Sequence, residues 1–423
     1  MKVLWITNIL FPEAISLLTN NADLKSSGGW MLGLAKSLQK ETPIELSVAT
    51  VSSLVKSLTV LKGEKTIYYV IPLGKGNIKY NKEYESFWKE VYEKVRPEIV
   101  HIHGTEFSHG YAFINACPQA KIVISIQGLI SVCARYYNSG LKTSEIIRNT
   151  SPIELLKLQT LFNAKRNFRK RGCEIEIPMI KKVGHVIGRT EWDKAHVWAI
   201  NPKAKYHICN EILREDFYEG CWEYNKCCRH TIFISQAGYP IKGLHMLLKA
   251  MPLVLRKYPD TTIKIAGNNI TQCNSLLQKI KISSYGKIIR SLIKRNRLER
   301  QVVFLNPLSS EEMKREYLKC NVFICPSTIE NSPNSLGEAQ LLGVPCISSY
   351  IGGVANMIPN DLCGKTYRFE EIEMLAKSIV DVFEESSSFD NKIMRQIANE
   401  RHNVKANAIN QYDIYNEIIN EKS

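Results

Sequence analysis

The chain of 423 residues lacks any apolar run close to the roughly 18 residues that a membrane-spanning helix needs. Its start is apolar at positions 3–6, but Thr7 and Asn8 interrupt that run and Pro12 follows soon after. No small-residue cleavage site accompanies it, so a first strand is favoured over a signal peptide. We therefore expect a protein on the cytoplasmic side of the membrane, without a membrane-spanning helix.

Motifs for common cofactors and metals are also missing. No G-x-G-x-x-G follows a predicted strand, which gives a nicotinamide dinucleotide site no support. The segment Gly364-Lys365-Thr366 ends like a P-loop, but Pro359 stands where the first glycine would be. There is no D-x-D pair, and the cysteines around position 227 lack the paired C-x-x-C spacing of a zinc site. We expect no cofactor, no bound metal and reduced cysteines.

Acidic residues are scarce relative to basic ones: 41 Asp and Glu against 56 Lys and Arg, which gives a net charge of +15. Such a charge favours an anionic substrate, an anionic membrane face or nucleic acid. Basic clusters at 165–171 and 287–300 lie beside or among apolar residues, a pattern that suits a membrane surface. A solvated helix face explains them equally well. A membrane surface is therefore a candidate partner, whereas nucleic acid is not expected.

The length and the hydrophobic content of 44% are enough for two sizeable cores. Strand-like and helix-like runs alternate in the first part of the chain, and a second alternating set begins at 231, after a polar stretch at 211–230. Alternation of this kind is typical of doubly wound parallel sheets in an α/β protein. We predict strands at 2–7, 44–50, 66–71, 99–102, 122–126, 231–235, 262–266, 302–305 and 322–325.

The segment 321–354 contains the most informative pattern. A buried strand at 322–325 is followed by a polar loop with Glu330 and by a helix with Glu338, which Asn334 or Ser335 can cap. The amino end of that helix offers unpaired amides to an anion. The two carboxylates, eight positions apart, can accept hydrogen bonds from vicinal sugar hydroxyls. Alternatively, Ser335 and Glu338 form only a capping box, S-x-x-E.

Glu330 and Glu338 resemble the E-x7-E signature of retaining GT-B glycosyltransferases, most closely family 4, the glycosyl transferases group 1. The resemblance implies two Rossmann-like domains facing across a cleft, with a last helix that crosses back to the first domain. We expect boundaries at 1–210, 211–395 and 396–423. In that family the first Glu contacts the donor sugar and the second the nucleotide ribose. The neighbouring Asn334, Ser335 and Leu336 would bind the donor as well.

The segment 236–243, QAGYPIKG, resembles the family's G-R-x-x-x-x-K-G, in which Arg and Lys both bind the diphosphate. Lys242 matches the family's Lys, but Ala237 replaces its Arg. Arg189 and Arg214 are candidates to replace that cation. Lys242 could alternatively be an ordinary solvated lysine. The loop with Gly28 and Gly29 resembles the family's glycine loop, where a close backbone meets the diphosphate.

The segment 101–106, HIHGTE, resembles the family's H-x-H-G and ends a buried strand. His103 and Glu106 would then project into the cleft. Gln127 stands where many family members carry a His near the donor sugar. Each of the histidines in this segment could alternatively be only a structural hydrogen-bonding group.

The resemblance implies a retaining, metal-independent transfer of a hexosyl or related group from a nucleotide-diphosphate sugar, with UDP favoured as the nucleotide. Glu330, Lys242 and His103 are the predicted catalytic residues, and the leaving phosphate would take the acceptor's proton. We expect a glycan acceptor, lipid-linked at the inner membrane face, in bacterial capsule or lipopolysaccharide synthesis. A GT-B sugar-nucleotide epimerase and a non-catalytic glycan- or nucleic-acid-binding protein remain the alternatives.

Overall fold

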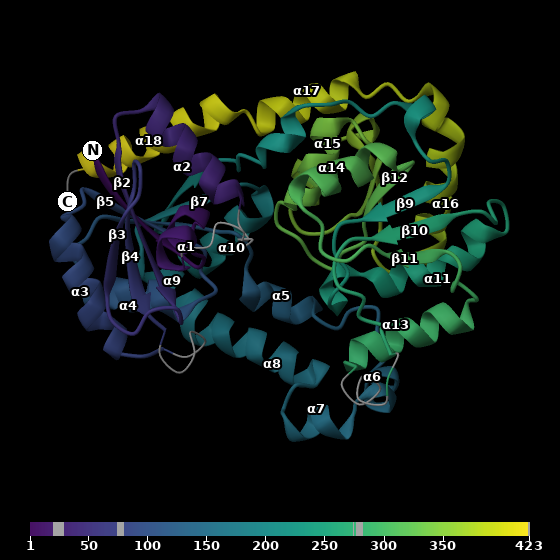
Figure 1. The fold of residues 1–423 in the computed structure, drawn as a ribbon, viewed down its shortest axis with the longest axis horizontal. Coiled ribbons are helices and arrows are strands. Elements are labelled where there is room, and N and C mark those ends of the chain that lie inside the picture. The colour runs from purple at the N-terminus through teal and green to yellow at the C-terminus, as the bar shows by residue number, and fades with distance from the viewer. Residues whose placement is uncertain (20–28, 74–79, 274, 276–281, 422–423) are drawn as a thin grey trace. The chain divides into compact units, whose positions relative to one another are not determined.

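The computed structural model describes residues 1–19, 29–73, 80–273, 275 and 282–421 (Figure 1). The chain divides into two compact units. Unit 1 comprises Met1–Val132, Arg169–Leu213 and His402–Ser423, and unit 2 comprises Cys133–Phe168 and Arg214–Arg401. Each unit contains a largely parallel sheet with helices, so the predicted α/β class is confirmed. The segment 133–168, which groups with unit 2, was not anticipated by the boundaries expected from the sequence.

The sheet of unit 1 runs β3-β4-β2-β1-β5-β6-β7-β8 among the described residues, and only the β3–β4 pair is antiparallel. The five strands predicted for this part of the chain are present, and three further strands, β3, β7 and β8, were not predicted. The strands are β1 (Lys2–Thr7), β2 (Glu45–Ser52), β3 (Thr59–Lys62), β4 (Ile67–Pro72), β5 (Ile99–His103), β6 (Ile122–Ser125), β7 (His185–Gly188) and β8 (Lys205–Ile208).

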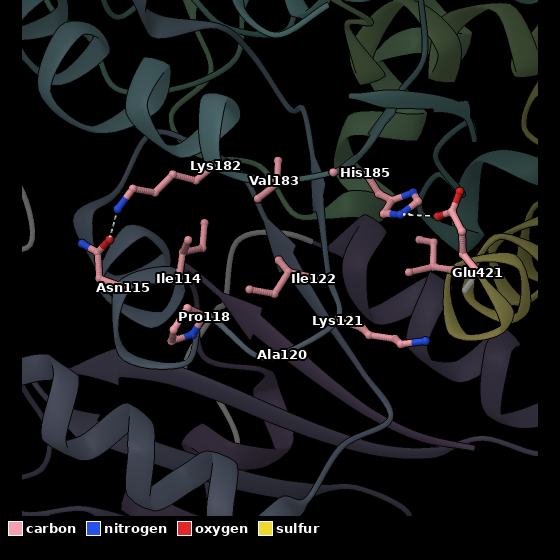
Figure 2. Close-up of a pocket in the computed structure, with 12 residues that line it drawn as sticks. Ile114, Asn115, Pro118, Ala120, Lys121, Ile122, Lys182, Val183, His185 and Glu421 are labelled. Atoms are coloured by element: carbon pink, nitrogen blue, oxygen red, sulfur yellow. Dashed lines mark hydrogen bonds and ion pairs between the residues drawn. The ribbon is translucent and has the colours of Figure 1, made fainter. Parts of the chain in front are cut away.

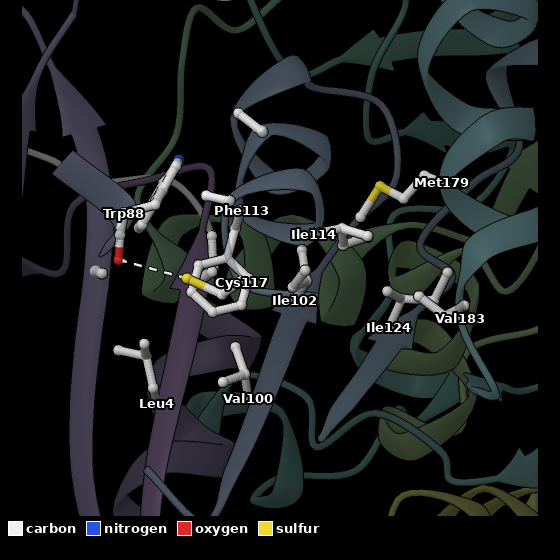
Figure 3. Close-up of a cluster of buried hydrophobic side chains, with 14 of the residues drawn as sticks. Leu4, Trp88, Val100, Ile102, Phe113, Ile114, Cys117, Ile124, Met179 and Val183 are labelled. Carbon is white, nitrogen blue, oxygen red and sulfur yellow. Dashed lines mark hydrogen bonds between the residues drawn. The ribbon is translucent and has the colours of Figure 1, made fainter. Parts of the chain in front are cut away.

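Helices cover both faces of this sheet, so its central strands are nearly continuous apolar runs. On one face Trp88 meets Phe113 edge to face, with ring centroids 5.7 Å apart, over the β5 side chains (Figure 3). On the other face the indole of Trp5 donates a hydrogen bond of 2.9 Å to the hydroxyl of Tyr415. The described helices of unit 1 are α1 (Pro12–Thr19), α2 (Gly29–Glu41), α3 (Glu83–Val95), α4 (Ser108–Ala116), α9 (Ile177–Lys182), α10 (Glu191–Ile200) and α18 (Val404–Asn420).

The helix α18 comes from the end of the chain and packs in the core of unit 1 through side chains such as Ile414 and Tyr415. It therefore returns to the unit in which the chain begins, as the fold class implies. Two helices, α5 (Ile130–Tyr136) and α8 (Leu161–Arg171), include residues assigned to both units.

The sheet of unit 2 is entirely parallel in the described part of the chain, in the order β11-β10-β9-β12-β13-β14. Its strands are β9 (Thr231–Ile234), β10 (Thr262–Ile265), β11 (Val302–Phe304), β12 (Val322–Cys325), β13 (Cys346–Ser349) and β14 (Lys365–Tyr367). The described helices are α6 (Thr143–Asn149), α7 (Pro152–Leu156), α11 (Leu244–Leu255), α13 (Ser284–Arg295), α14 (Ser310–Lys319), α15 (Asn334–Leu342), α16 (Ile372–Glu385) and α17 (Lys392–Arg401).

Two helices of unit 2 test particular predictions. Ser309 and Glu312 have the S-x-x-E spacing that predicts the start of a helix, and they form a complete capping box at the start of α14. The interpretation of 287–300 as a membrane-facing stretch is wrong, because the apolar residues Ile288, Ile289 and Leu292 of α13 are buried. A solvated basic face explains that stretch. Among the described residues, no helix has both the length and the apolar character needed to cross a bilayer.

The strand orders place one switch point in each unit. In unit 2 the chain builds outward from β9 to β11 and then resumes on the other side at β12, so the direction reverses between β9 and β12. In unit 1 the same reversal lies between β1 and β5. Ligands of open parallel sheets bind beyond the carboxyl ends of the strands at such points. The loops after β9, β12, β1 and β5 are therefore the places to look for a site.

Candidate active site

Lys242 and Glu330 meet at the switch point of unit 2. Lys242 lies in the loop after β9 and Glu330 in the loop after β12, and Nζ lies 2.7 Å from Oε1 of Glu330. The hydroxyl of Ser327 donates to the same carboxylate oxygen at 2.8 Å. Burial acts to lower the pKa of Lys242, but the Glu330 carboxylate and then Tyr239 act in the opposite direction and together outweigh it, so the pKa is raised. The pair is 20% and 16% exposed, so both charges remain within reach of a ligand.

The two loops are fixed to each other through backbone contacts. The amide of Thr328 donates a 2.7 Å hydrogen bond to the carbonyl of Ile241. Gly243 has φ of 70°, and a Cβ there would lie 1.6 Å from the carbonyl oxygen of Pro326. Only glycine allows both this conformation and this approach. The position of Lys242 is therefore set by the loop after β12 as well as by its own strand.

Gly352 supports Glu330 in the same way, and its replacement by alanine is predicted to destabilise the protein. Its φ is 50°, a Cβ would lie 1.8 Å from the Glu330 carbonyl oxygen, and the amide of Gly353 donates to that oxygen at 3.0 Å. The left-handed backbone and the clash together should cost about 2 kcal/mol or more. Urea unfolding measures this loss. The control is Gly238→Ala, where a Cβ meets nothing within 4 Å, and equal stability of the two variants would refute the prediction.

The helix α15 begins differently from the prediction. Its amino-terminal cap is Pro333 and no side chain caps it, so the expected cap by Asn334 or Ser335 is wrong. The capping-box alternative for Ser335 and Glu338 is also wrong, because the Glu338 carboxylate binds Arg214. The first amides of a helix have no acceptor within the helix, so those of Asn334 and Ser335 remain available to an anion. The Leu336 amide instead donates to the Pro333 carbonyl at 2.9 Å.

Glu338 forms a two-pronged ion pair with Arg214. Arg214 Nε and Nη2 donate to the two carboxylate oxygens at 2.7 Å and 2.8 Å. The side chain of Glu338 is 5% exposed and that of Arg214 is 31% exposed. Burial raises the pKa of Glu338, and Arg214 opposes that shift. Arg214, a candidate to replace the missing cation of the 236–243 segment, is thus held by Glu338.

His103 lies at the switch point of unit 1, at the end of β5. Its ring stacks on His101 with centroids 3.8 Å apart and lies 4.3 Å from Trp5. Both ring nitrogens are buried and lack a hydrogen-bond partner among the described residues. Burial first, and the neighbouring His101 and Arg189 next, lower the pKa of His103 well below its usual value. His103 is therefore a neutral imidazole whose two nitrogens are unpaired within the part of the chain that the structure describes.

Glu106 lies close to this histidine in the chain and links the two central strand ends of unit 1. Asn8, directly after β1, donates to its Oε1 at 2.9 Å, whereas Oε2 is buried without a partner in the described part of the chain. Burial raises the pKa of Glu106. The loop after β1 and the loop after β5 thus meet, as the strand order requires.

The other predicted donor residues of unit 1 have different surroundings. Arg189, after β7, is buried and forms a 2.7 Å ion pair with Glu211, and it donates to the carbonyl of Ile126 beside Gln127. Its guanidinium also lies 5.7 Å from the ring of Trp30. Gln127 follows β6 and is partly buried. Gly29 is the first residue of α2, whereas Gly28 lies outside the described residues.

Acid is predicted to weaken unit 1 through His101. Burial, with a smaller effect of Arg189, lowers the pKa of His101 to about 3 from 6.5. Because the folded pKa is depressed, the stability it contributes is present above pH 6.5 and is lost as the pH falls toward 3. Unfolding free energies measured across this range should fall more steeply for the natural protein than for His101→Gln, which cannot titrate. Parallel slopes would contradict the assignment.

Sequence reasoning missed several members of these sites. Ser327 was not identified, although it lies three residues before Glu330 in the same loop. Asn8 was noted only as a polar interruption of the first strand, and its position directly after that strand was the available signal. No local signal indicated that Arg214 would bind a carboxylate 124 positions away.

A separate cavity of about 560 Å³ lies in unit 1 at the amino ends of strands, whereas His103 lies at the carboxyl end of β5 (Figure 2). Ile122 and His185, at the amino ends of β6 and β7, line it together with Lys182, which donates to Asn115, and Glu421. It therefore contains none of the predicted site residues. Within the described ranges, no group of three or more His, Cys, Asp or Glu side chains is arranged to hold a metal ion.

Comparison with known proteins matches the family model of the glycosyl transferases group 1 to residues 229–411. The gpi3 subunit of phosphatidylinositol N-acetylglucosaminyltransferase from Schizosaccharomyces pombe is 22% identical over 163 residues, 38% of this chain and 32% of that protein. The matches span about a third of the length of the first curated relatives. Each of these alignments covers less than half of the chain.

Solved structures extend the likeness to the whole chain. Sucrose-phosphate synthase from Thermosynechococcus elongatus has a TM-score of 0.71 at 14% identity and covers 99% of both chains. The Anabaena protein HepE, solved with UDP and glucose, has a TM-score of 0.65 at 13% identity, covering 98% of this chain and 99% of its own. At such identities the likeness shows the fold, which is GT-B.

Proposed function

We propose that this chain, whose residues 229–411 match the family model of the glycosyl transferases group 1, transfers a sugar from a nucleotide-diphosphate sugar to a glycan acceptor. The observation that carries the proposal is the Lys242–Glu330 pair at the switch point of unit 2, beside the uncapped amino end of α15. A cation, a carboxylate and free amides together suit a phosphate with a neighbouring sugar.

The chemistry requires negative charge to be stabilised on the leaving diphosphate. The Lys242 ammonium has three protons and donates one to Glu330, so others can reach a phosphate oxygen. The amides of Asn334 and Ser335 add donors at the positive end of the α15 dipole. Because Gly243 and Gly352 fix the loops that carry Lys242 and Glu330, this pair is preorganised for the charge that develops during bond breaking.

Glu330 and Glu338 would bind hydroxyls. Among the described residues, Lys242 and Ser327 both donate to Oε1 of Glu330. Its Oε2 would therefore accept a hydrogen bond from a sugar hydroxyl. Glu338 would accept from the ribose through the second lone pairs of oxygens that already bind Arg214. In this proposal Arg214 keeps the buried carboxylate ionised rather than binding phosphate. His103, a neutral imidazole, would serve as a hydrogen-bonding group near the donor sugar and not as a cation.

UDP is the favoured nucleotide, and retention without metal the favoured reaction, because of the resemblance in the E-x7-E and 236–243 segments. HepE, which shares the fold, was solved with UDP. A lipid-linked acceptor at the inner membrane face, in bacterial capsule or lipopolysaccharide synthesis, is the favoured setting. The gpi3 relative, whose name describes a transfer to phosphatidylinositol, supports the lipid character of the acceptor and not the rest of this setting.

A donor screen tests the proposal. Purified full-length protein is incubated with UDP-, GDP- and ADP-sugars, with and without lipid-linked glycan acceptors, and nucleotide release is measured. Acceptor-dependent release is expected. Conversion of the sugar nucleotide without an acceptor would instead show an epimerase, and binding of glycans or oligonucleotides without release or conversion would show a non-catalytic protein.

A further inference from the structure

Three leucines at the end of α7 and in the turn after it are exposed to an unusual degree. Leu155, Leu156 and Leu158, which we call the leucine tip, are 60%, 85% and 64% exposed. All three belong to the segment 133–168 of unit 2. Ile147 on α6 and Phe162 on α8 are exposed as well. Scattered single apolar residues on a surface need no explanation, but several within one short segment indicate an interaction.

The leucine tip is held in place rather than loosely attached. Ser151 and Glu154 form a complete capping box at the start of α7. The buried carboxylate of Glu154 also accepts hydrogen bonds of 2.7 Å from both the amide and the hydroxyl of Ser284, at the start of α13. The Gln159 amide donates to the Glu154 carbonyl at 2.8 Å and closes the turn. The leucine tip therefore lies on a fixed element, at the junction of α7 and α8, the two helices labelled in Figure 1.

Leu158 adds an independent sign of function. Its φ is 53°, a left-handed conformation that bulky side chains rarely adopt. Glycine or asparagine would take this conformation more easily, and an exposed leucine gains nothing from packing to offset it. A strained and exposed apolar side chain is explained if it is buried by something outside the chain.

The charge around the leucine tip indicates what that partner is. The segment 133–168 has six basic residues and two acidic ones, a net charge of +4. One of the two acidic residues is Glu154, whose carboxylate is satisfied internally. Lys157 lies between the leucines and is exposed, and Arg148 and Arg166 are exposed on α6 and α8. Further along α8 follow Arg169, Lys170 and Arg171. Exposed leucines interleaved with cations match the boundary between anionic headgroups and acyl chains.

We propose that the leucine tip inserts into the surface of an anionic lipid bilayer, with the surrounding Lys and Arg side chains on the headgroups. The inference deepens the proposed function, because a lipid-linked acceptor would lie in the same bilayer surface. Only this link between the bilayer and the acceptor rests on the proposed function. Binding itself needs neither donor nor turnover. The apolar face of α13, by contrast, is buried and makes no such contact.

Sedimentation of the full chain with vesicles tests the proposal. Vesicles of phosphatidylcholine alone are compared with an equimolar mixture of phosphatidylcholine and phosphatidylglycerol, at low and high salt. We expect binding to the anionic vesicles, weakened by salt. The triple change Leu155→Ser, Leu156→Ser and Leu158→Ser should reduce the apparent affinity by about tenfold or more. Lys157→Glu should reduce it by about fivefold or more on anionic vesicles.

Leu362→Ser is the matched control, because Leu362 is an exposed leucine of the same unit, 51% exposed, outside the segment. It should bind vesicles like the natural protein. All variants should keep their melting temperature, since the replaced leucines are exposed. Binding by the triple variant that equals the natural protein would overturn the proposal. The proposal would also be overturned if the natural protein did not bind vesicles. In that case, light scattering that showed self-association of the natural protein and not of the triple variant would make the leucine tip a contact between copies of the chain.

Nucleotide release is measured separately, which keeps the two proposals distinguishable. A chain that turns over sugar nucleotides but ignores vesicles overturns only the membrane inference. A chain that binds vesicles through the leucine tip but releases no nucleotide overturns only the transferase.

Discussion

Replacing Lys242 by methionine is expected to lower kcat for sugar transfer by about 10²- to 10³-fold, the effect of removing one preorganised charge-stabilising donor. The effect should fall on kcat more than on KM, because the diphosphate gains charge only as the glycosidic bond breaks. Steady-state kinetics with the donor found in the screen would measure both constants.

The matched control is Lys264→Met. Lys264 pairs with Glu316 at 2.9 Å in the same unit and has similar exposure to Lys242, but it lies within β10 and away from the switch point. It should change kcat by no more than a few-fold. If both variants lost kcat equally, or if Lys242→Met changed KM alone, Lys242 would not stabilise the transition state.

Replacing Arg214 by alanine is expected to destabilise the protein by about 2 to 3 kcal/mol at pH 7. Removing one partner of a buried ion pair leaves an uncompensated charge, and the full cost is reduced here because Arg214 is 31% exposed. Burial already raises the pKa of Glu338, and loss of Arg214 should raise it further. Urea unfolding of the two proteins gives the difference in free energy.

The penalty should depend on pH in one direction. When the pKa of Glu338 is higher in the folded state than in the unfolded state, the folded state binds the proton more tightly. The loss of stability caused by ionising Glu338 therefore grows as the pH rises through the folded pKa. The penalty of Arg214→Ala should therefore be smaller at pH 5 than at pH 7. The double variant Arg214→Ala with Glu338→Gln should also recover part of the loss. A penalty that is the same at both pH values in the single variant would refute the account.

The strands were predictable from the sequence where they are buried on both faces. The runs at 2–7, 99–102 and 322–325 are largely apolar because helices cover both sides of the parallel sheets. The strands that were missed carry weaker patterns. β3 alternates between partly buried and exposed residues at the sheet edge, and β7 and β8 are four-residue strands that contain histidines.

Features that depend on distant partners were not predictable. Ser335 and Glu338 have the spacing of a capping box, but Arg214 binds the carboxylate and Pro333 is the cap residue before the helix. The segment 133–168 groups with unit 2, where the side chain of Glu154 contacts Ser284, 130 positions away. Local patterns describe local structure, and these contacts are tertiary.

The ligand loop at 321–354 was predictable from its own residues, but that Lys242 belongs with it was predictable only through the resemblance. Lys242 and Glu330 are 88 positions apart, and nothing in their own segments places them together. They meet because β9 and β12 are neighbours at the point where the sheet changes direction. Their roles in binding a donor stay predictions, and the geometry supports them by placing a cation beside a carboxylate at a strand switch.

A crystal structure of the full chain with its donor sugar nucleotide tests the central claim most directly. We predict a diphosphate oxygen within about 3.2 Å of Lys242 Nζ and of an amide at the start of α15, the usual limit for such hydrogen bonds. Glu330 should contact a sugar hydroxyl and Glu338 the ribose. A nucleotide bound elsewhere, such as in the cavity beside Lys182 and His185, with the Lys242–Glu330 pair undisturbed, would contradict the account.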